Sequence, residues 1–145
     1  MTIAIAHGSI PDSHRDLLVR PIHGVLTTMD PDGQPHSVLV WLDADGDVVR
    51  VNTTRGRQSA RNLAANPRAS VLVVDPDDTS RFLQVRGDAE FVGDGAVEHL
   101  DALTRAYTTH PRFYGFVYPS EAAGRERRVI CRIRPVRVSV DAIHR

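Results

Sequence analysis

"PHSVLVWLDADGDVVRVNTTRGRQSARNL" (residues 35–63) contains two strand patterns, a tight turn and the start of a helix. The pair Asp45-Gly46 marks a turn between two apolar runs, so the runs are predicted to form an antiparallel hairpin. In residues 37–42 apolar side chains occupy both alternating faces, which predicts a strand buried on both sides. A helical pattern follows at about residues 57–65 and ends before Pro67, because a proline disfavours helix at the preceding residue. The stretch therefore predicts an antiparallel β protein with a helix inserted between strands.

Strand patterns continue on both sides of this stretch. The turn sequence "DPDG" at residues 30–33 closes the preceding strand, and Gly87 inside a long later strand predicts a bulge or bend. A second, amphipathic helix pattern covers residues 94–110. The six predicted strands lie at residues 23–30, about 36–42, about 48–54, 68–75, 80–92 and 129–143. Six strands joined mostly by antiparallel hairpins predict a mainly β, closed barrel with helical inserts.

Composition limits the kinds of protein this chain can be. Its 145 residues, 41% of them hydrophobic, fit one globular domain over residues 1–145. A formal net charge of +0 argues against a general nucleic-acid or membrane-surface binder. The N-terminus lacks the basic segment of a signal peptide, and no apolar run is long enough to span a bilayer. We therefore expect a cytoplasmic protein.

The cysteine and the histidines give no sign of a metal site. The only cysteine, Cys131, lies in a strand pattern, and we expect it to be a small core residue. The seven histidines include no pair spaced four residues apart and have no neighbouring cysteine set. We therefore expect no bound metal.

The junction after the second strand of the hairpin has the features of an anion site. The polar residues 52–54 end the strand, and a glycine then turns the chain into the helix. The first N–H groups of a helix have no intrahelical partner and lie at the positive end of its dipole, which favours a phosphate. Arg57 and Arg61 share one helix face, and Arg55 adds a third guanidinium. The alternative is that these arginines are solvated side chains beside a tight turn.

Three runs carry a resemblance to a known family: "LTTMDPDGQPHSVLVWL", "RVNTTRGRQSARNLAANPRASVLVVDP" and "RFLQVRGDAEF". Together they resemble the flavin and deazaflavin oxidoreductases with a six-stranded, antiparallel split β-barrel, the FMN-binding split-barrel fold. That group includes the pyridoxamine 5'-phosphate oxidase-like proteins. The likeness covers about residues 12–140 and is greater to the actinobacterial branch that uses the deazaflavin coenzyme F420.

The resemblance implies a homodimer with two cofactor sites at the interface between subunits. The residues it places around the cofactor phosphate are Asn52, Thr53, Thr54, Arg55, Arg57 and Arg61. It places Gln34, Pro35 and Ser37 beside the ring, and Arg81 and Phe82 reach the same groove from the partner subunit. Relatives often carry a basic residue where this chain has Gln58-Ser59, and a missing charged hydrogen bond weakens binding by roughly 1.5–3 kcal/mol.

The implied activity is hydride transfer from reduced coenzyme F420 to a small conjugated or heterocyclic substrate. No catalytic residue is named, because the coenzyme carries the hydride and solvent can supply the proton that follows. One alternative is an FMN-dependent, pyridoxamine-phosphate-oxidase-like enzyme. The other is a non-catalytic module of the same fold that binds a cofactor or haem.

Further residues have two interpretations each. His36 is a candidate substrate contact or a solvated residue, and Trp41 is a core residue or packs on the cofactor. The aromatic segment 113–118 is a lid over the substrate or dimer packing. Residues 124–128, "GRERR", form a solvated loop or contact the acidic tail of the deazaflavin coenzyme.

Overall fold

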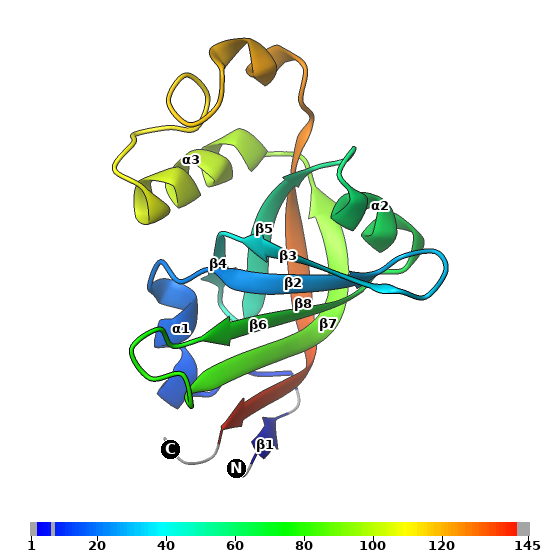
Figure 1. The fold of residues 1–145 in the computed structure, drawn as a ribbon, viewed down its shortest axis with the longest axis vertical. Helices are drawn as coiled ribbons and strands as arrows, with labels where there is room; N and C mark the ends of the chain where they lie inside the picture. Colours follow the sequence, from blue (N-terminus) through cyan, green and yellow to red (C-terminus); the bar gives the residue numbers. More distant parts are fainter. Residues whose placement is uncertain (1–2, 7, 142–145) are drawn as a thin grey trace.

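The structure is a computed structural model that describes residues 3–6 and 8–141. Figure 1 shows a curled sheet with helices at its sides and at one end. The strands are β1 (Ile3–Ala6), β2 (Gly24–Met29), β3 (Pro35–Val40), β4 (Leu42–Asp45), β5 (Val48–Thr54), β6 (Arg68–Val74), β7 (Phe82–Val92) and β8 (Arg128–Asp141). The helices are α1 (Asp16–Val19), α2 (Gln58–Ala65) and α3 (Ala96–Tyr107), with 3-10 turns η1 (Asp12–His14) and η2 (Ser120–Gly124).

Every strand pair in the sheet is antiparallel, which confirms the mainly β, hairpin-built architecture. Strands follow the order β3-β2-β6-β7-β8-β5-β4, and β1 pairs with β8 outside this path. The sheet curls into a half-barrel, as a split barrel requires. The 14-residue strand β8 pairs with β7, β5 and β1, so it joins the two halves of the sheet.

The predicted count of six strands is wrong. The path contains seven strands and β1 adds an eighth. The run predicted as one strand divides at Trp41: Val40 pairs with Gly24 of β2, whereas Leu42 pairs with Val51 of β5. β3 and β4 are therefore joined through one residue but lie at opposite ends of the strand order. At Trp41 the chain passes from one edge of the half-barrel to the other. No glycine or proline marks this bend in the sequence.

The predicted irregularity at Gly87 is confirmed. The register between β7 and β8 shifts between Arg86 and Gly87, and Gly87 lies opposite Pro135. A Cβ atom on Gly87 would lie 2.0 Å from the carbonyl oxygen of Arg134, so only glycine lets the two strands approach this closely. The bulge increases the local twist and helps the long strands to curl.

Alternate residues of the strands fill the interior of the barrel. Cys131 is fully buried among them, which confirms it as a core residue, and burial raises the pKa of its thiol to about 12. The fully buried aliphatic side chains include Leu17, Leu42, Val49, Leu83, Ile133 and Val138. Within the described residues, no helix combines the length and the apolar character that crossing a bilayer requires.

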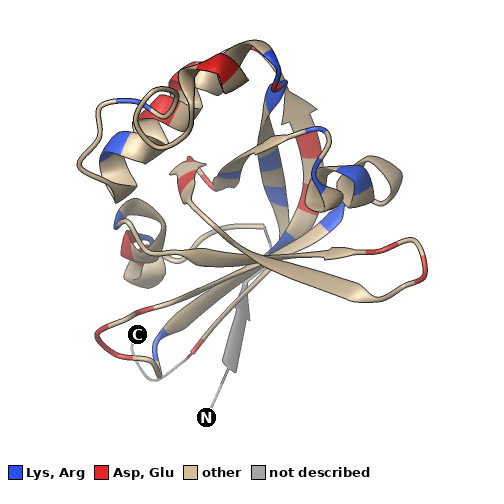
Figure 2. Ribbon diagram, turned by 45° about the horizontal axis from the view of Figure 1, so that its top comes forward, with Lys and Arg blue, Asp and Glu red and all other residues tan. Residues whose placement is uncertain are grey.

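The helices position one end of the barrel for binding. α3 and the irregular segment 108–127 cover the end drawn at the top of Figure 1, and α2 lies at the side of that end. Figure 2 shows basic residues along β8 and around the start of α2. Acidic residues gather on α3 and on the loops between β2 and β3 and between β6 and β7.

Candidate functional site

A cleft of about 670 Å³ lies between the sheet and its helical cover. Strands β3 and β5, the start of α2, α3 and the segment before β8 all contribute to it. The lining residues are His23, Leu26, His36, Val38, Leu39, Val40, Trp41, Val51, Asn52, Thr53, Arg57, Gln58, Ser59, Leu100, Phe113, Val117 and Arg128. The only charged members of this lining are two arginines, so the cleft is basic.

The end of the cleft at α2 is polar and positively charged. Arg57 is the N-cap residue of α2, and no side chain caps the first turn of the helix. Gln58 and Ser59, the first two helical residues, also line the cleft. Among the described residues, no ion pair includes Arg57. Uncapped helical N–H groups beside an arginine without a carboxylate partner are suited to bind a phosphate.

The other two arginines of the predicted anion site lie outside the cleft lining. Arg61 donates hydrogen bonds to the carbonyl oxygen of Gly56 (2.5 Å) and to Gln58 Oε1 (2.6 Å). It therefore stabilises the turn that leads into α2. Arg55 lies over the ring of Phe91, with its guanidinium carbon 5.4 Å from the ring centre. Thr54 is also absent from the lining, whereas Asn52, Thr53 and Arg57 belong to it.

Asn52 is held by a chain of side chains from three elements. Its Nδ2 donates to the carbonyl oxygen of Ala96 (2.7 Å) and lies 3.1 Å from Nδ1 of His99. His99 Nε2 lies 3.1 Å from Asp43 Oδ1, and Arg50 donates two hydrogen bonds to that carboxylate (2.8 and 2.7 Å). Asn52 Oδ1 is buried without a hydrogen-bond partner among the described residues, so it is an unpaired acceptor in a residue that lines the cleft.

The carboxyl of Asp43 anchors this chain as an anion. Burial opposes its ionisation, but hydrogen bonds from His99 and Arg50 outweigh that effect and hold the pKa of Asp43 below its usual value. An ionised Asp43 accepts a hydrogen bond from His99 Nε2. His99 Nδ1 is then the acceptor for the hydrogen bond from Asn52 Nδ2. This arrangement has no local sequence pattern, because its members lie on β4, β5 and α3.

The opposite wall of the cleft is aromatic. Trp41 stacks on Tyr107 (ring centres 5.5 Å apart, 18° between planes) and meets Phe113 edge to face at 6.4 Å. Phe113 in turn stacks on Tyr118 at 5.9 Å. Of the two interpretations of segment 113–118, the structure supports a cleft wall for Phe113, which is buried and lines the cleft. Trp41 is half-buried and forms part of the same wall.

The residues predicted beside the cofactor ring lie outside the cleft lining. Gln34, Pro35 and Ser37 are not part of the cleft lining, and Ser37 Oγ instead hydrogen-bonds to Thr27 Oγ1 at 2.8 Å. His36 and Val38 line the cleft, because alternate residues of a strand point to opposite faces. The ring contacts of Gln34, Pro35 and Ser37 stay a prediction that concerns the assembled dimer.

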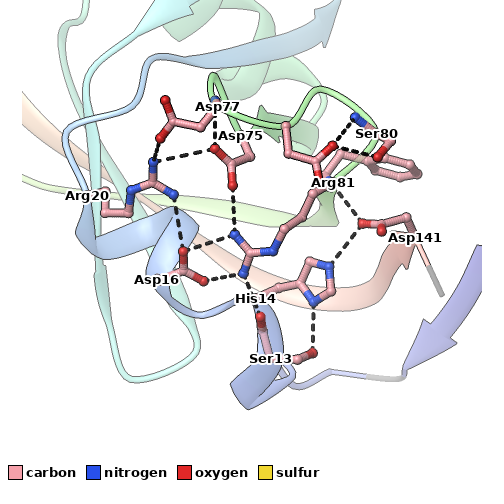
Figure 3. Close-up of polar contacts among 11 residues, drawn as sticks. Ser13, His14, Asp16, Arg20, Asp75, Asp77, Ser80, Arg81 and Asp141 are labelled. Atoms are coloured by element: carbon pink, nitrogen blue, oxygen red, sulfur yellow. Dashed lines mark hydrogen bonds and ion pairs between the residues drawn. The ribbon is translucent and has the colours of Figure 1, made fainter. Parts of the chain in front are cut away.

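Arg81 and Phe82 lie at a distance from the cleft within this chain. Figure 3 shows Arg81 between Asp16 and Asp75, with bonds of 2.5 and 3.1 Å to their carboxylates. Asp16 is the main cause of the raised pKa of Arg81, and a backbone hydrogen bond from Asp77 is the main cause that lowers the pKa of Asp75 to about 2. Arg81 therefore already has internal carboxylate partners, and its predicted reach into a partner's groove stays a prediction.

The fold and the cleft together define a class of protein: an antiparallel half-barrel whose cleft is lined by two arginines, the start of a helix and an aromatic wall. The family profile described as pyridoxamine 5'-phosphate oxidase matches residues 10–140. The chain therefore belongs to this family of split-barrel flavin and deazaflavin oxidoreductases.

Solved structures agree with this assignment. A structure described as an F420 reductase shares 36% sequence identity, with a TM-score of 0.74 over 89% of this chain and 98% of that one. A conserved hypothetical protein from Mycobacterium tuberculosis shares 28% identity, with a TM-score of 0.69 over 94% of this chain and 88% of that one. A heme-binding protein from Mycobacterium smegmatis shares the fold at 22% identity and a TM-score of 0.63, covering 92% of this chain and 55% of its own.

Proposed function

We propose that this protein is a reductase that binds coenzyme F420 and uses it to reduce a small conjugated or heterocyclic substrate. The observation that carries the proposal is the combination of groups in the cleft lining: Arg57 and an uncapped helix start together with an aromatic wall. A cofactor that carries a phosphate, with a flat substrate beside its ring, matches these two kinds of group. The 36% identity to a structure described as an F420 reductase favours the deazaflavin over FMN.

The residues present fit such a cofactor. The N–H groups at the start of α2 and the guanidinium of Arg57 would hold the phosphate of the cofactor. Asn52 Oδ1 would accept a hydrogen bond from a hydroxyl group of the cofactor. Bound in its reduced form, the coenzyme would supply the hydride. Trp41 and Phe113 would pack on the substrate, hold it against the reacting ring and exclude water from that ring.

A parallel titration of the purified protein with coenzyme F420, FMN and haem tests the proposal, with binding measured by calorimetry. We expect the tightest binding for coenzyme F420, and turnover of its reduced form with a conjugated acceptor. Tighter binding of FMN would support the FMN-dependent alternative. Tight haem binding without turnover of either cofactor would support the non-catalytic module.

Arg57→Gln tests the phosphate site itself. Loss of one charged hydrogen bond at an exposed site weakens cofactor binding by about tenfold. Arg55→Gln is the matched control, because Arg55 is an exposed arginine two residues away that lies outside the cleft. Equal affinity of both variants for the cofactor would refute an anion site at Arg57.

We further propose that the protein is a homodimer. The outer face of the sheet carries a second groove of about 420 Å³ lined by residues of β2, β6, β7 and β8. Val136 in this groove is 57% exposed. Exposed aliphatic side chains beside an open groove are typical of a surface that another subunit covers.

A further inference from the structure

Arg128 is an unusual arginine because its side chain is only 5% exposed yet lines the cleft. It is the first residue of β8 and pairs with Thr54 of β5. Its guanidinium carbon lies 4.8 Å from the ring centre of Phe113. The sequence "GRERR" suggested a solvated loop, and the structure shows that this interpretation is wrong for its last residue.

Two neighbours fix the orientation of the Arg128 guanidinium. Nε donates to the hydroxyl of Tyr114 at 3.0 Å, and Nη2 donates to Glu126 Oε1 at 3.1 Å. The Tyr114 hydroxyl also donates to Glu126 Oε1 at 2.7 Å, so the three side chains form a closed set. The planar guanidinium is therefore held in one orientation before any ligand binds.

The third nitrogen, Nη1, is the free donor of this group. It has no hydrogen-bond partner in the part of the chain that the structure describes, and it is not among the fully buried unpaired atoms. Because Arg128 lines the cleft, the Nη1 N–H groups are open to it. An oriented, nearly buried cation with an open donor binds an anionic oxygen more strongly than a solvated arginine does.

The surroundings of Nη1 define the shape and charge of its ligand. Phe113 and Trp41 form an aromatic wall, and Leu100 and Val117 add apolar surface to the same end of the cleft. No aspartate or glutamate lines the cleft within the described residues. A flat apolar body packs on such a wall, and an anionic oxygen at Nη1 would share the guanidinium with Glu126, which pairs with Nη2.

We propose that Arg128, Trp41 and Phe113 form the acceptor subsite, which binds a planar conjugated compound that carries a carboxylate. The ring of this compound packs on Trp41 and Phe113, and its carboxylate accepts hydrogen bonds from Arg128 Nη1. The assignment of this ligand as the substrate rests on the proposed reductase function, whereas its binding does not. Arg57 and the start of α2 would hold the cofactor phosphate, whereas the contacts of Arg128 with Phe113 and Tyr114 direct it to the aromatic wall.

Cinnamate and cinnamamide provide a matched pair of probes, because they share a flat conjugated body and differ in charge. Calorimetry gives their affinities, and the fluorescence of Trp41, the only tryptophan, reports whether the probe lies at the subsite. We expect cinnamate to bind at least tenfold more tightly than cinnamamide and to change the fluorescence of Trp41. Equal affinities, or no binding of cinnamate, would overturn the proposal.

Variants of two neighbouring arginines locate the charge. Arg128→Gln is expected to weaken cinnamate binding ten- to hundredfold and to leave cinnamamide binding within a fewfold of wild type. Arg128→Lys restores part of the loss, because it keeps the charge without the planar fork. Arg127→Gln is the control, since Arg127 is exposed and does not line the cleft. If Arg127→Gln and Arg128→Gln weaken cinnamate binding equally, the proposal is overturned. If Arg128→Gln does not fold, the comparison of cinnamate with cinnamamide in the wild-type protein still tests the proposal.

The last experiment separates this subsite from the cofactor site. Cinnamate is titrated into protein saturated with coenzyme F420, and we expect its affinity to stay within a fewfold of that without coenzyme. Full displacement of cinnamate by the coenzyme would assign the subsite to the coenzyme and overturn the proposal. Arg128-dependent cinnamate binding by a protein that does not bind the coenzyme would support the subsite and refute the proposed reductase function.

Discussion

Replacing Gly87 by alanine is expected to cost the protein at least about 3 kcal/mol of stability, typical of severe backbone conflicts. The added methyl group would lie 2.0 Å from the carbonyl oxygen and 2.8 Å from the carbonyl carbon of Arg134. Both are backbone atoms of β8, so no side chain can move aside. The two strands must separate at the bulge, which breaks neighbouring hydrogen bonds of the longest strand pair in the sheet.

Thermal and urea unfolding measure this cost. For a chain of this size, a loss of about 3 kcal/mol lowers the melting temperature by roughly 6–12 °C. Gly93→Ala is the matched control, because a Cβ atom there meets nothing within 4 Å and the backbone does not adopt a positive φ. If both variants unfold at the same temperature and urea concentration, the argument that a close strand approach requires Gly87 is refuted.

Three more predictions concern charge, the cleft and assembly. The pKa of Asp75 is about 2 in the folded protein, below the usual 3.8 of an aspartate. The backbone hydrogen bond from Asp77 and the bonds from Arg20 and Arg81 therefore stabilise the fold above about pH 4, and this contribution is lost as the pH falls towards 2. Asp75→Asn should therefore flatten the dependence of the unfolding free energy on pH in that range, and an unchanged slope would contradict the assignment. His99→Ala removes the hydrogen bonds that His99 makes to Asn52 and Asp43, which should cost about 1–3 kcal/mol in urea unfolding and weaken cofactor binding. Wild-type values for both would show that His99 does not position Asn52. Val136→Glu places a charge on the outer groove and should turn the proposed dimer into a monomer in light scattering, whereas a wild-type mass for the variant would exclude this face as the interface.

Local features of the sequence were enough to predict most of the sheet. Turn sequences such as Asp45-Gly46 and the alternating apolar residues identified the hairpins, because both signals act between near neighbours. Gly87 and Cys131 were also interpreted correctly from their positions within strand patterns. The division of one strand at Trp41 was missed, since the change of pairing partner depends on how the whole sheet curls.

The candidate site was harder to predict than the fold. Arg57 lies in a local strand-to-helix junction, and that junction is visible in the sequence. The roles of His99 and Arg128 depend on contacts between α3, β4, β5 and the segment before β8, which are distant in the sequence. A single chain also does not test the residues expected from a partner subunit, Arg81 and Phe82.

The position of Trp41 couples recognition to folding. The same residue joins the two outermost strands of the sheet and presents its indole to whatever occupies the cleft. A bound aromatic molecule must therefore slow the local opening of β3 and β4, and amide hydrogen exchange in these strands would decrease as ligand is added. The stability of the two edge strands of this protein would therefore report whether the cleft holds a ligand.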